Sequence, residues 1–216
     1  MKISKKIFGL VIATAIVFSG GGFNNGNLHT IQTVEAKQVE KVKKTKRIKL
    51  NKLKTYKDVD EAYLQNLEKI MNKEQIQNKK DITFEKVLKY AEKSSKVAST
   101  AKSNSQKIDT VDKLVSLDDL SNNTSREVME ECIKYMMSEY EKNQLQDKNK
   151  ALQYQYIARY LDKRLDNHPN MKDAHDMVFD MHQIAKDTFR EDSSSMEANF
   201  HQVDKKIKRV KWYLQK

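Results

Sequence analysis

The amino-acid sequence predicts an all-α fold, an antiparallel bundle of about five or six helices that follows an N-terminal signal peptide and a disordered basic arm. Two observations predict the helical class. All five glycines lie within the first 26 residues, and the chain has one proline, Pro169. Tight hairpin turns and phosphate-binding loops usually need glycine. Beyond residue 57, apolar residues recur with the period of about 3.6 residues that is typical of amphipathic helices.

Residues 1–36 have the features of a bacterial signal peptide. Three lysines precede an apolar run over 7–18, and a stretch containing small residues ends at Ala36. The apolar run is too short to cross a bilayer, which takes about 20 residues. We therefore expect cleavage between Ala36 and Lys37, a secreted chain that is extracellular or associated with the cell surface, and no integral membrane span after cleavage. The alternative, an uncleaved anchor, is disfavoured by the glycine triplet at 20–22.

Residues 37–56 form the predicted basic arm. Positions 37–54 carry nine lysine or arginine residues and one acid, which accounts for most of the chain's net charge of +11. A block of like charges cannot be buried, so we expect it to be flexible. The arm is a candidate site for binding an anionic surface, such as a cell-wall polymer or lipid. Its candidate residues are Lys41, Lys43, Lys44, Lys46, Arg47, Lys49, Lys52 and Lys54. The alternative is a solvated tether between the cleavage site and the domain. Nucleic acid is not an expected partner, because no aromatic residue interleaves with the basic ones.

The helical domain is expected to span residues 57–216. Its first helix is predicted to begin at Asp58, which resembles a capping box with Glu61, and to end near Gln77. Thr83 is expected to cap the second helix.

The middle of the domain is less regular. Residues 94–107 are rich in serine, threonine, asparagine and lysine, which predicts a frayed helix end followed by a loop or linker. A short helix is expected over 108–120. The periodic stretch over 123–167 is either one long helix or two helices that meet near 146–149.

Pro169 ends this stretch, because the residue before a proline avoids the helical conformation. Asn170 is expected to cap a helix that reaches about Arg190, and the serines at 193–195 are expected to form a break. The final helix carries a one-sided apolar stripe, formed by Met196, Phe200, Val203, Ile207, Val210 and Leu214.

The sequence contains no recognisable catalytic motif. Three histidines, at 168, 175 and 182, are seven residues apart, which is too far along a helix for one metal ion. The single cysteine, Cys132, has apolar neighbours at helical spacing and is expected to be a buried thiol. No serine lies in a nucleophile motif, and the carboxylates alternate with lysines. We therefore predict no catalytic residue, metal ion or cofactor.

Tyr154, Tyr156 and Tyr160 lie in a segment rich in tyrosine. Tyr154 and Tyr156 are about 200° apart around a helix, so the three side chains are not all expected to face inward. Exposed tyrosine is common at protein interfaces. The three residues are therefore candidates for a protein interface with an unidentified partner, and the alternative is a mixture of core and boundary positions.

These features predict a secreted, non-catalytic bacterial binding protein that associates with an anionic envelope or host surface. One alternative is a membrane-active factor whose C-terminal basic amphipathic helix lies on an anionic membrane. The other is an exported enzyme with an unrecognised site. A buried cluster of histidine and carboxylate side chains would favour the enzyme.

Overall fold

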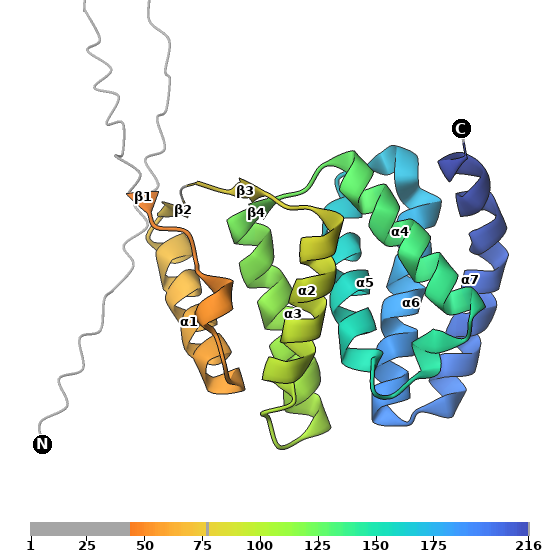
Figure 1. Ribbon diagram of the computed structural model, residues 1–216, viewed down its shortest axis with the longest axis horizontal. Coiled ribbons are helices and arrows are strands. Elements are labelled where there is room, and N and C mark those ends of the chain that lie inside the picture. Colours follow the sequence, from red (N-terminus) through yellow and green to blue (C-terminus); the bar gives the residue numbers. More distant parts are fainter. Residues whose placement is uncertain (1–43, 77, 216) are drawn as a thin grey trace, which may run out of the picture. The chain divides into compact units, whose positions relative to one another are not determined.

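Seven α-helices make up the part of the chain that the computed structural model describes, residues 44–76 and 78–215 (Figure 1). The all-α class is therefore confirmed, with more helices than the five or six expected. The predicted signal peptide and its cleavage site between Ala36 and Lys37 lie outside the described residues.

In chain order the helices are α1 (Tyr56–Met71), α2 (Phe84–Ala98), α3 (Asn104–Ser121), α4 (Arg126–Glu141), α5 (Ala151–Leu165), α6 (Lys172–Arg190) and α7 (Ser193–Leu214). There are also three short 3-10 turns: η1 (Leu50–Lys52) precedes α1, η2 (Gln144–Gln146) lies between α4 and α5, and η3 (Pro169–Met171) lies between α5 and α6. Four two-residue strands are β1 (Lys44–Thr45), β2 (Gln75–Ile76), β3 (Lys80–Asp81) and β4 (Asn122–Asn123). They form two parallel pairs, β1 with β2 and β3 with β4.

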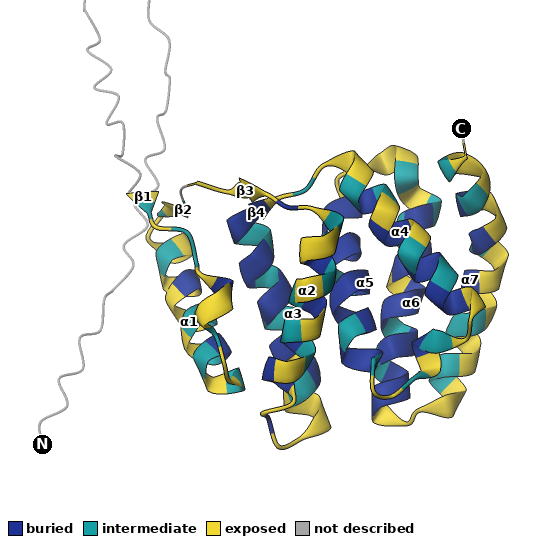
Figure 2. Cartoon of the chain, viewed as in Figure 1, coloured by how far each residue is buried: buried dark blue, intermediate teal, exposed yellow. Residues whose placement is uncertain are grey.

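α5 is the central helix of this bundle. It packs against α2, α3, α4 and α6. Twelve of its fifteen residues are buried, as the dark blue ribbon in Figure 2 shows. A helix covered on several sides has no solvated face, so its buried residues need not form a single stripe.

Capping side chains decide where the first helices begin. The capping box of α1 begins at Thr55, three residues before the predicted Asp58. Thr55 is the N-cap, and Asp58 completes the box from the third helical position. α3 also has a capping box, formed by Ser103 and Gln106. Thr83 occupies the N-cap position of α2, as predicted, although its side chain makes no capping hydrogen bond.

Within the predicted loop or linker over 94–107, residues 99–103 do connect two helices, but the rest is helix. α2 continues through Ala98 and buries Ser94 and Val97, and α3 already begins at Asn104. Composition suggested fraying here, but these small side chains let the helix end pack closely against the core.

The long periodic stretch over 123–167 is two helices, α4 and α5. Asn143 adopts a left-handed conformation with φ of 57° just after α4. Asparagine tolerates this region better than most residues. Leu145 in η2 is fully buried, which anchors the connection to the core.

The last two helices also differ slightly from expectation at their ends. η3 precedes α6, so that helix begins at Lys172 instead of after an Asn170 cap. The predicted break at 193–195 is the first turn of α7, because Asp192 caps the helix by accepting a hydrogen bond from the Ser195 N–H.

Candidate functional site

The best-defined charged feature of the described chain is a basic strip, formed by Lys44, Lys46, Arg47, Lys49, Lys52 and Lys54. The arm over 37–56 was expected to be flexible, and that expectation is wrong for residues 44–56, which pack on the helices. Residues 37–43, with Lys41 and Lys43, lie outside the described residues.

Apolar side chains between the basic ones anchor the strip. Leu50 is 8% exposed and belongs to the hydrophobic core, and Ile48 and Leu53 pack against that core. The lysines of the strip are exposed and Arg47 is half-buried. A charge block resists burial only through its charged groups, so the leucines and isoleucine remain free to attach it to the body.

Hydrogen bonds fix the same segment to α2 and α3, and the start of α1 to the connection between those two helices. The Lys93 ammonium on α2 donates to the Leu50 carbonyl at 2.9 Å, and the Ser121 hydroxyl on α3 donates to the Ile48 carbonyl at 3.4 Å. The Tyr56 N–H, at the start of α1, donates to the Thr100 hydroxyl at 2.9 Å.

The cations of the basic strip form no close ion pair within the described residues, although Asp58 lies near Lys54. Within residues 44–76 and 78–215, no carboxylate forms an ion pair with any of its six cations. Lys93 lies beside it, and the pKa of Lys93 is lowered, first by burial and then by the charge of Lys54. The arrangement therefore concentrates positive potential at one site, which attracts anions.

The three tyrosines predicted to form a protein interface are instead part of the core. Tyr154, Tyr156 and Tyr160 are at most 2% exposed. The interface prediction assumed that one side of their helix meets solvent, whereas α5 is covered on several sides. The Tyr154 hydroxyl donates to Glu139 at 2.7 Å, and burial raises the pKa of all three phenols.

The core also contains a charged pair that sequence reasoning missed. Arg164 stacks on the Tyr160 ring, 3.5 Å from its centre, and its Nη2 donates to Asp118 Oδ2 at 3.1 Å. Asn122 donates to the other oxygen of Asp118 at 2.5 Å. Burial raises the pKa of Asp118 to about 6, although Arg164 and Asn122 act in the opposite direction.

Two histidines of α6 contact carboxylates on other helices. His175 Nε2 lies 3.0 Å from Asp162 Oδ1 on α5, and His182 Nε2 lies 3.5 Å from Asp112 Oδ1 on α3. Sequence reasoning considered only partners on the same helix and missed both pairs.

His175 borders a depression of about 530 Å³. Arg159, which pairs with Asp162, and Lys163 also line it, together with the exposed Phe179. No group of three or more histidine, cysteine, aspartate or glutamate side chains among the described residues is arranged to hold a metal ion.

Cys132 is a buried free thiol, as predicted. Burial raises its pKa to about 12 from an ordinary value of 9.0. The nucleophilic form of cysteine is the thiolate, so the raised pKa keeps this thiol protonated and unreactive at neutral pH.

The apolar stripe of α7 packs inside the bundle. Val203, Ile207 and Val210 are buried, and α7 packs along α6. Its basic face bonds to acids of other helices, with Lys206 donating to Asp180 at 2.6 Å and Lys211 paired with a glutamate of α4. The hypothesis of a membrane-active helix requires this stripe to be exposed, whereas its side chains pack against the core.

Comparison of the chain with known protein families, with curated proteins and with solved structures finds no match. Within the described residues, none of the helices combines the length and the apolar character needed to cross a bilayer. The functional proposal therefore depends on the chemistry of the residues described above.

Proposed function

We propose that this chain is a secreted, non-catalytic bacterial binding protein that attaches to an anionic envelope or host surface through its basic strip. One observation carries the proposal: six cations that form no close ion pair within the described residues are held in a single packed segment. A segment fixed in place loses less conformational entropy on binding than a free arm does.

The physical magnitudes are sufficient for reversible attachment. A basic residue near an anionic lipid surface contributes about 1 kcal/mol, so several acting together give appreciable affinity. Exposed charges are screened over a Debye length of about 8 Å at physiological ionic strength. Binding should therefore weaken steeply as salt is added.

The proposal includes export by the signal peptide, with cleavage between Ala36 and Lys37. Its support is the order of a basic start, a short apolar run and a small residue before the cleavage point. N-terminal sequencing of the protein from the culture medium tests this part. A chain that begins at Met1 in the medium would contradict it.

A protein partner remains part of the proposal, although the tyrosines are no longer candidates for its interface. We assign the partner to α1, because four of its large apolar side chains are exposed, Leu64, Leu67, Ile70 and Met71. Clustered exposed apolar residues are typical of interaction surfaces. A partner captured by the natural chain should be lost with the double variant Leu64→Ser and Leu67→Ser, and its retention would exclude α1.

A matched pair of charge variants tests the basic strip. The first variant changes four of its lysines to glutamine, Lys46, Lys49, Lys52 and Lys54. The control changes four exposed lysines elsewhere, Lys102, Lys134, Lys205 and Lys208. Both lose the same net charge, so co-sedimentation with anionic vesicles or a phosphate-containing wall polymer separates local from total charge.

At low salt we expect the control to sediment like the natural protein and the strip variant to remain in solution. Equal sedimentation of the two variants would show that only net charge matters. Such a result would contradict a localised site.

The His175–Asp162 pair favours a second candidate function, an exported hydrolase. A buried carboxylate orients the imidazole, which is the arrangement of a general base. The imidazole would accept a proton from water as the oxygen attacks an ester carbonyl. The proton would then pass to the leaving alkoxide when the carbon–oxygen bond breaks.

An activity assay distinguishes the two candidate functions. A hydrolase should cleave chromogenic carboxylic esters, and His175→Gln should lose that activity while His201→Gln, on the exposed part of α7, retains it. No cleavage by the natural protein, or equal cleavage by both variants, would leave the binding function as the better account.

A further inference from the structure

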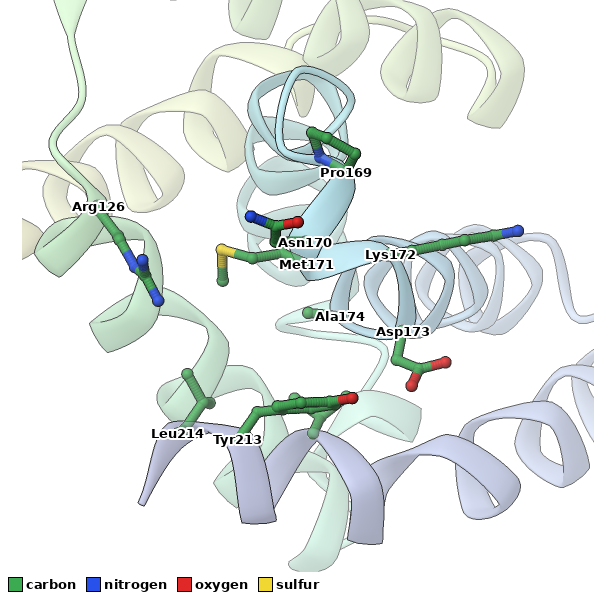
Figure 3. Close-up of a pocket in the computed structure, with 10 residues that line it drawn as sticks. Arg126, Pro169, Asn170, Met171, Lys172, Asp173, Ala174, Tyr213 and Leu214 are labelled. Carbon is green, nitrogen blue, oxygen red and sulfur yellow. The ribbon is translucent and has the colours of Figure 1, made fainter. Parts of the chain in front are cut away.

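A second site is formed where α4 and α6 begin and α7 ends, by residues that follow the basic strip in the sequence. Figure 3 shows residues of these three elements around one cavity of about 320 Å³. Arg126 is the first residue of α4, Met171 and Ala174 lie at the start of α6, and Tyr213 and Leu214 close α7. A cavity of this size is within the range of small-molecule sites.

Most of the cavity wall is apolar. Met171, Ala174, Val210 and Leu214 all line it, and the Tyr213 ring lies across its floor in Figure 3. Tyr213 is exposed on its outer side, so the cavity communicates with solvent. An apolar ligand body would replace water along this wall and gain about 25 cal/mol for each Å² buried.

Two cations, Arg126 and Lys172, and one carboxylate, Asp173, line the cavity. Arg126 donates from Nε to Glu130 at 2.8 Å, an exposed pair one helical turn apart, and such pairs contribute little. No partner within the described chain occupies its two terminal nitrogens, which carry four of its five donors. Asp173 is engaged by Arg209, whose Nη1 lies 3.4 Å from both carboxylate oxygens.

The orientation of the side chains supports the same reading. In Figure 3 the Arg126 side chain extends toward the space bordered by Met171 and Leu214, whereas the Lys172 side chain points away from it. A planar guanidinium binds a carboxylate through two parallel hydrogen bonds. It would do so here at the edge of an apolar wall.

We infer that this cavity binds a small amphiphilic carboxylate, with its acid group on Arg126 and its apolar body against Met171, Val210 and Leu214. The ligand class follows from the guanidinium of Arg126, which extends toward the cavity, and from the apolar lining. The site is independent of the basic strip, because none of the residues that line the cavity belongs to that segment.

The only tryptophan of the chain provides a direct probe of this site. Trp212 is exposed, and its ring centre lies 5.2 Å from that of Tyr213. Titration with octanoate should change the tryptophan emission in a saturable way, and calorimetry should give the same dissociation constant. Octanamide has a similar apolar body without the charge and should bind at least tenfold more weakly.

Two sets of variants separate charge from packing. Arg126→Met should weaken octanoate binding at least tenfold and leave octanamide binding unchanged, because a hydrogen bond to a charged group is lost. Arg190→Met removes the same charge from the end of α6 and should change neither. Leu214→Glu should abolish octanoate binding by repulsion, whereas Leu214→Gln, of the same size, should retain most of it.

Three results would overturn the inference. They are the absence of saturable octanoate binding by both methods, equal affinity for octanoate and octanamide, and an unchanged octanoate affinity in Arg126→Met. Circular dichroism of each variant ensures that a loss of binding is not a loss of fold. None of these outcomes depends on attachment through the basic strip.

Discussion

Arg164 on α5 and Asp118 on α3 form an ion pair inside the bundle, with 3.1 Å between Nη2 and Oδ2 and side chains that are 7% and 0% exposed. Removing two charges from water costs several kcal/mol per ion, and their attraction repays this only with good geometry and further hydrogen bonds. Asn122 and Thr124 also bond to the pair, but burial still outweighs these contacts, because the pKa of Asp118 is raised. The pair therefore joins α3 and α5 through two residues that lie 46 positions apart in the sequence.

The first prediction concerns the pH dependence of stability caused by Asp118. Its pKa is about 6 in the folded protein, mainly because of burial, against an ordinary value of 3.8. As pH rises from 4 to 6, the unfolded chain has already released this proton while the folded protein keeps it. The contribution to the free energy of unfolding is therefore largest below pH 4 and falls by up to about 3 kcal/mol as pH rises through 6.

Urea denaturation between pH 4 and 7 measures this effect. Asp118→Asn should flatten the decline, because the amide does not titrate, while Asp119→Asn, at the exposed neighbouring carboxylate, should preserve it. The same slope in all three proteins would contradict the assignment to Asp118.

The second prediction concerns Arg164. Arg164→Met keeps most of the apolar stem that packs on Tyr160 but leaves Asp118 without its cation. We expect a loss of about 3–5 kcal/mol at pH 7, where an unpaired carboxylate is buried. The loss should be clearly smaller at pH 4, where Asp118 is protonated in both proteins. Equal losses at the two pH values would show that the residue acts through packing alone.

The third prediction concerns the anchor of the basic strip. Leu50→Ala removes a buried side chain at the edge of the core and should lower stability by about 2 kcal/mol. Tryptic cleavage after the lysines of the strip should become faster, while the helical circular dichroism stays the same. Leu64→Ala makes the same change at an exposed position of α1 and should alter neither measurement. Rapid cleavage of the natural protein at the strip would instead support the flexible arm predicted from sequence.

The fourth prediction concerns Cys132. Because burial raises its pKa to about 12, the thiolate fraction at pH 8 is minute, and the side chain has no solvent contact. A thiol reagent such as DTNB should leave the native protein unlabelled for hours and modify one thiol per chain after unfolding in urea. Labelling of the native protein within minutes would show that the thiol is accessible.

Local chemistry in the sequence was sufficient for much of the secondary structure. The absence of glycine after residue 26 and the recurring apolar faces predicted helices, and Thr83 marked the start of α2 correctly. Pro169 also marked a real boundary, with η3 between α5 and α6. These signals are local, because a cap or a proline acts on backbone within a few residues of itself.

The errors arose where local composition and tertiary contact disagree. Ser94 and Val97 belong to a stretch that resembles a loop, yet they are buried in α2. The charges near Leu50 suggested a free arm, although the leucine and isoleucine among them were a usable signal for packing. The expectation that Tyr154 or Tyr156 is exposed was wrong, because no property of α5 alone reveals how many helices surround it.

The sequence by itself determined that this chain is helical, where several of its helices begin, that its positive charge is concentrated in residues 37–54, and that its one thiol is buried. Only the tertiary structure decided that the basic strip is packed, that α5 is central, and that His175, Arg164 and Arg126 meet their particular neighbours. The reason is physical: caps and periodicity act over a few residues, whereas burial and pairing depend on groups that approach one another only when the helices pack.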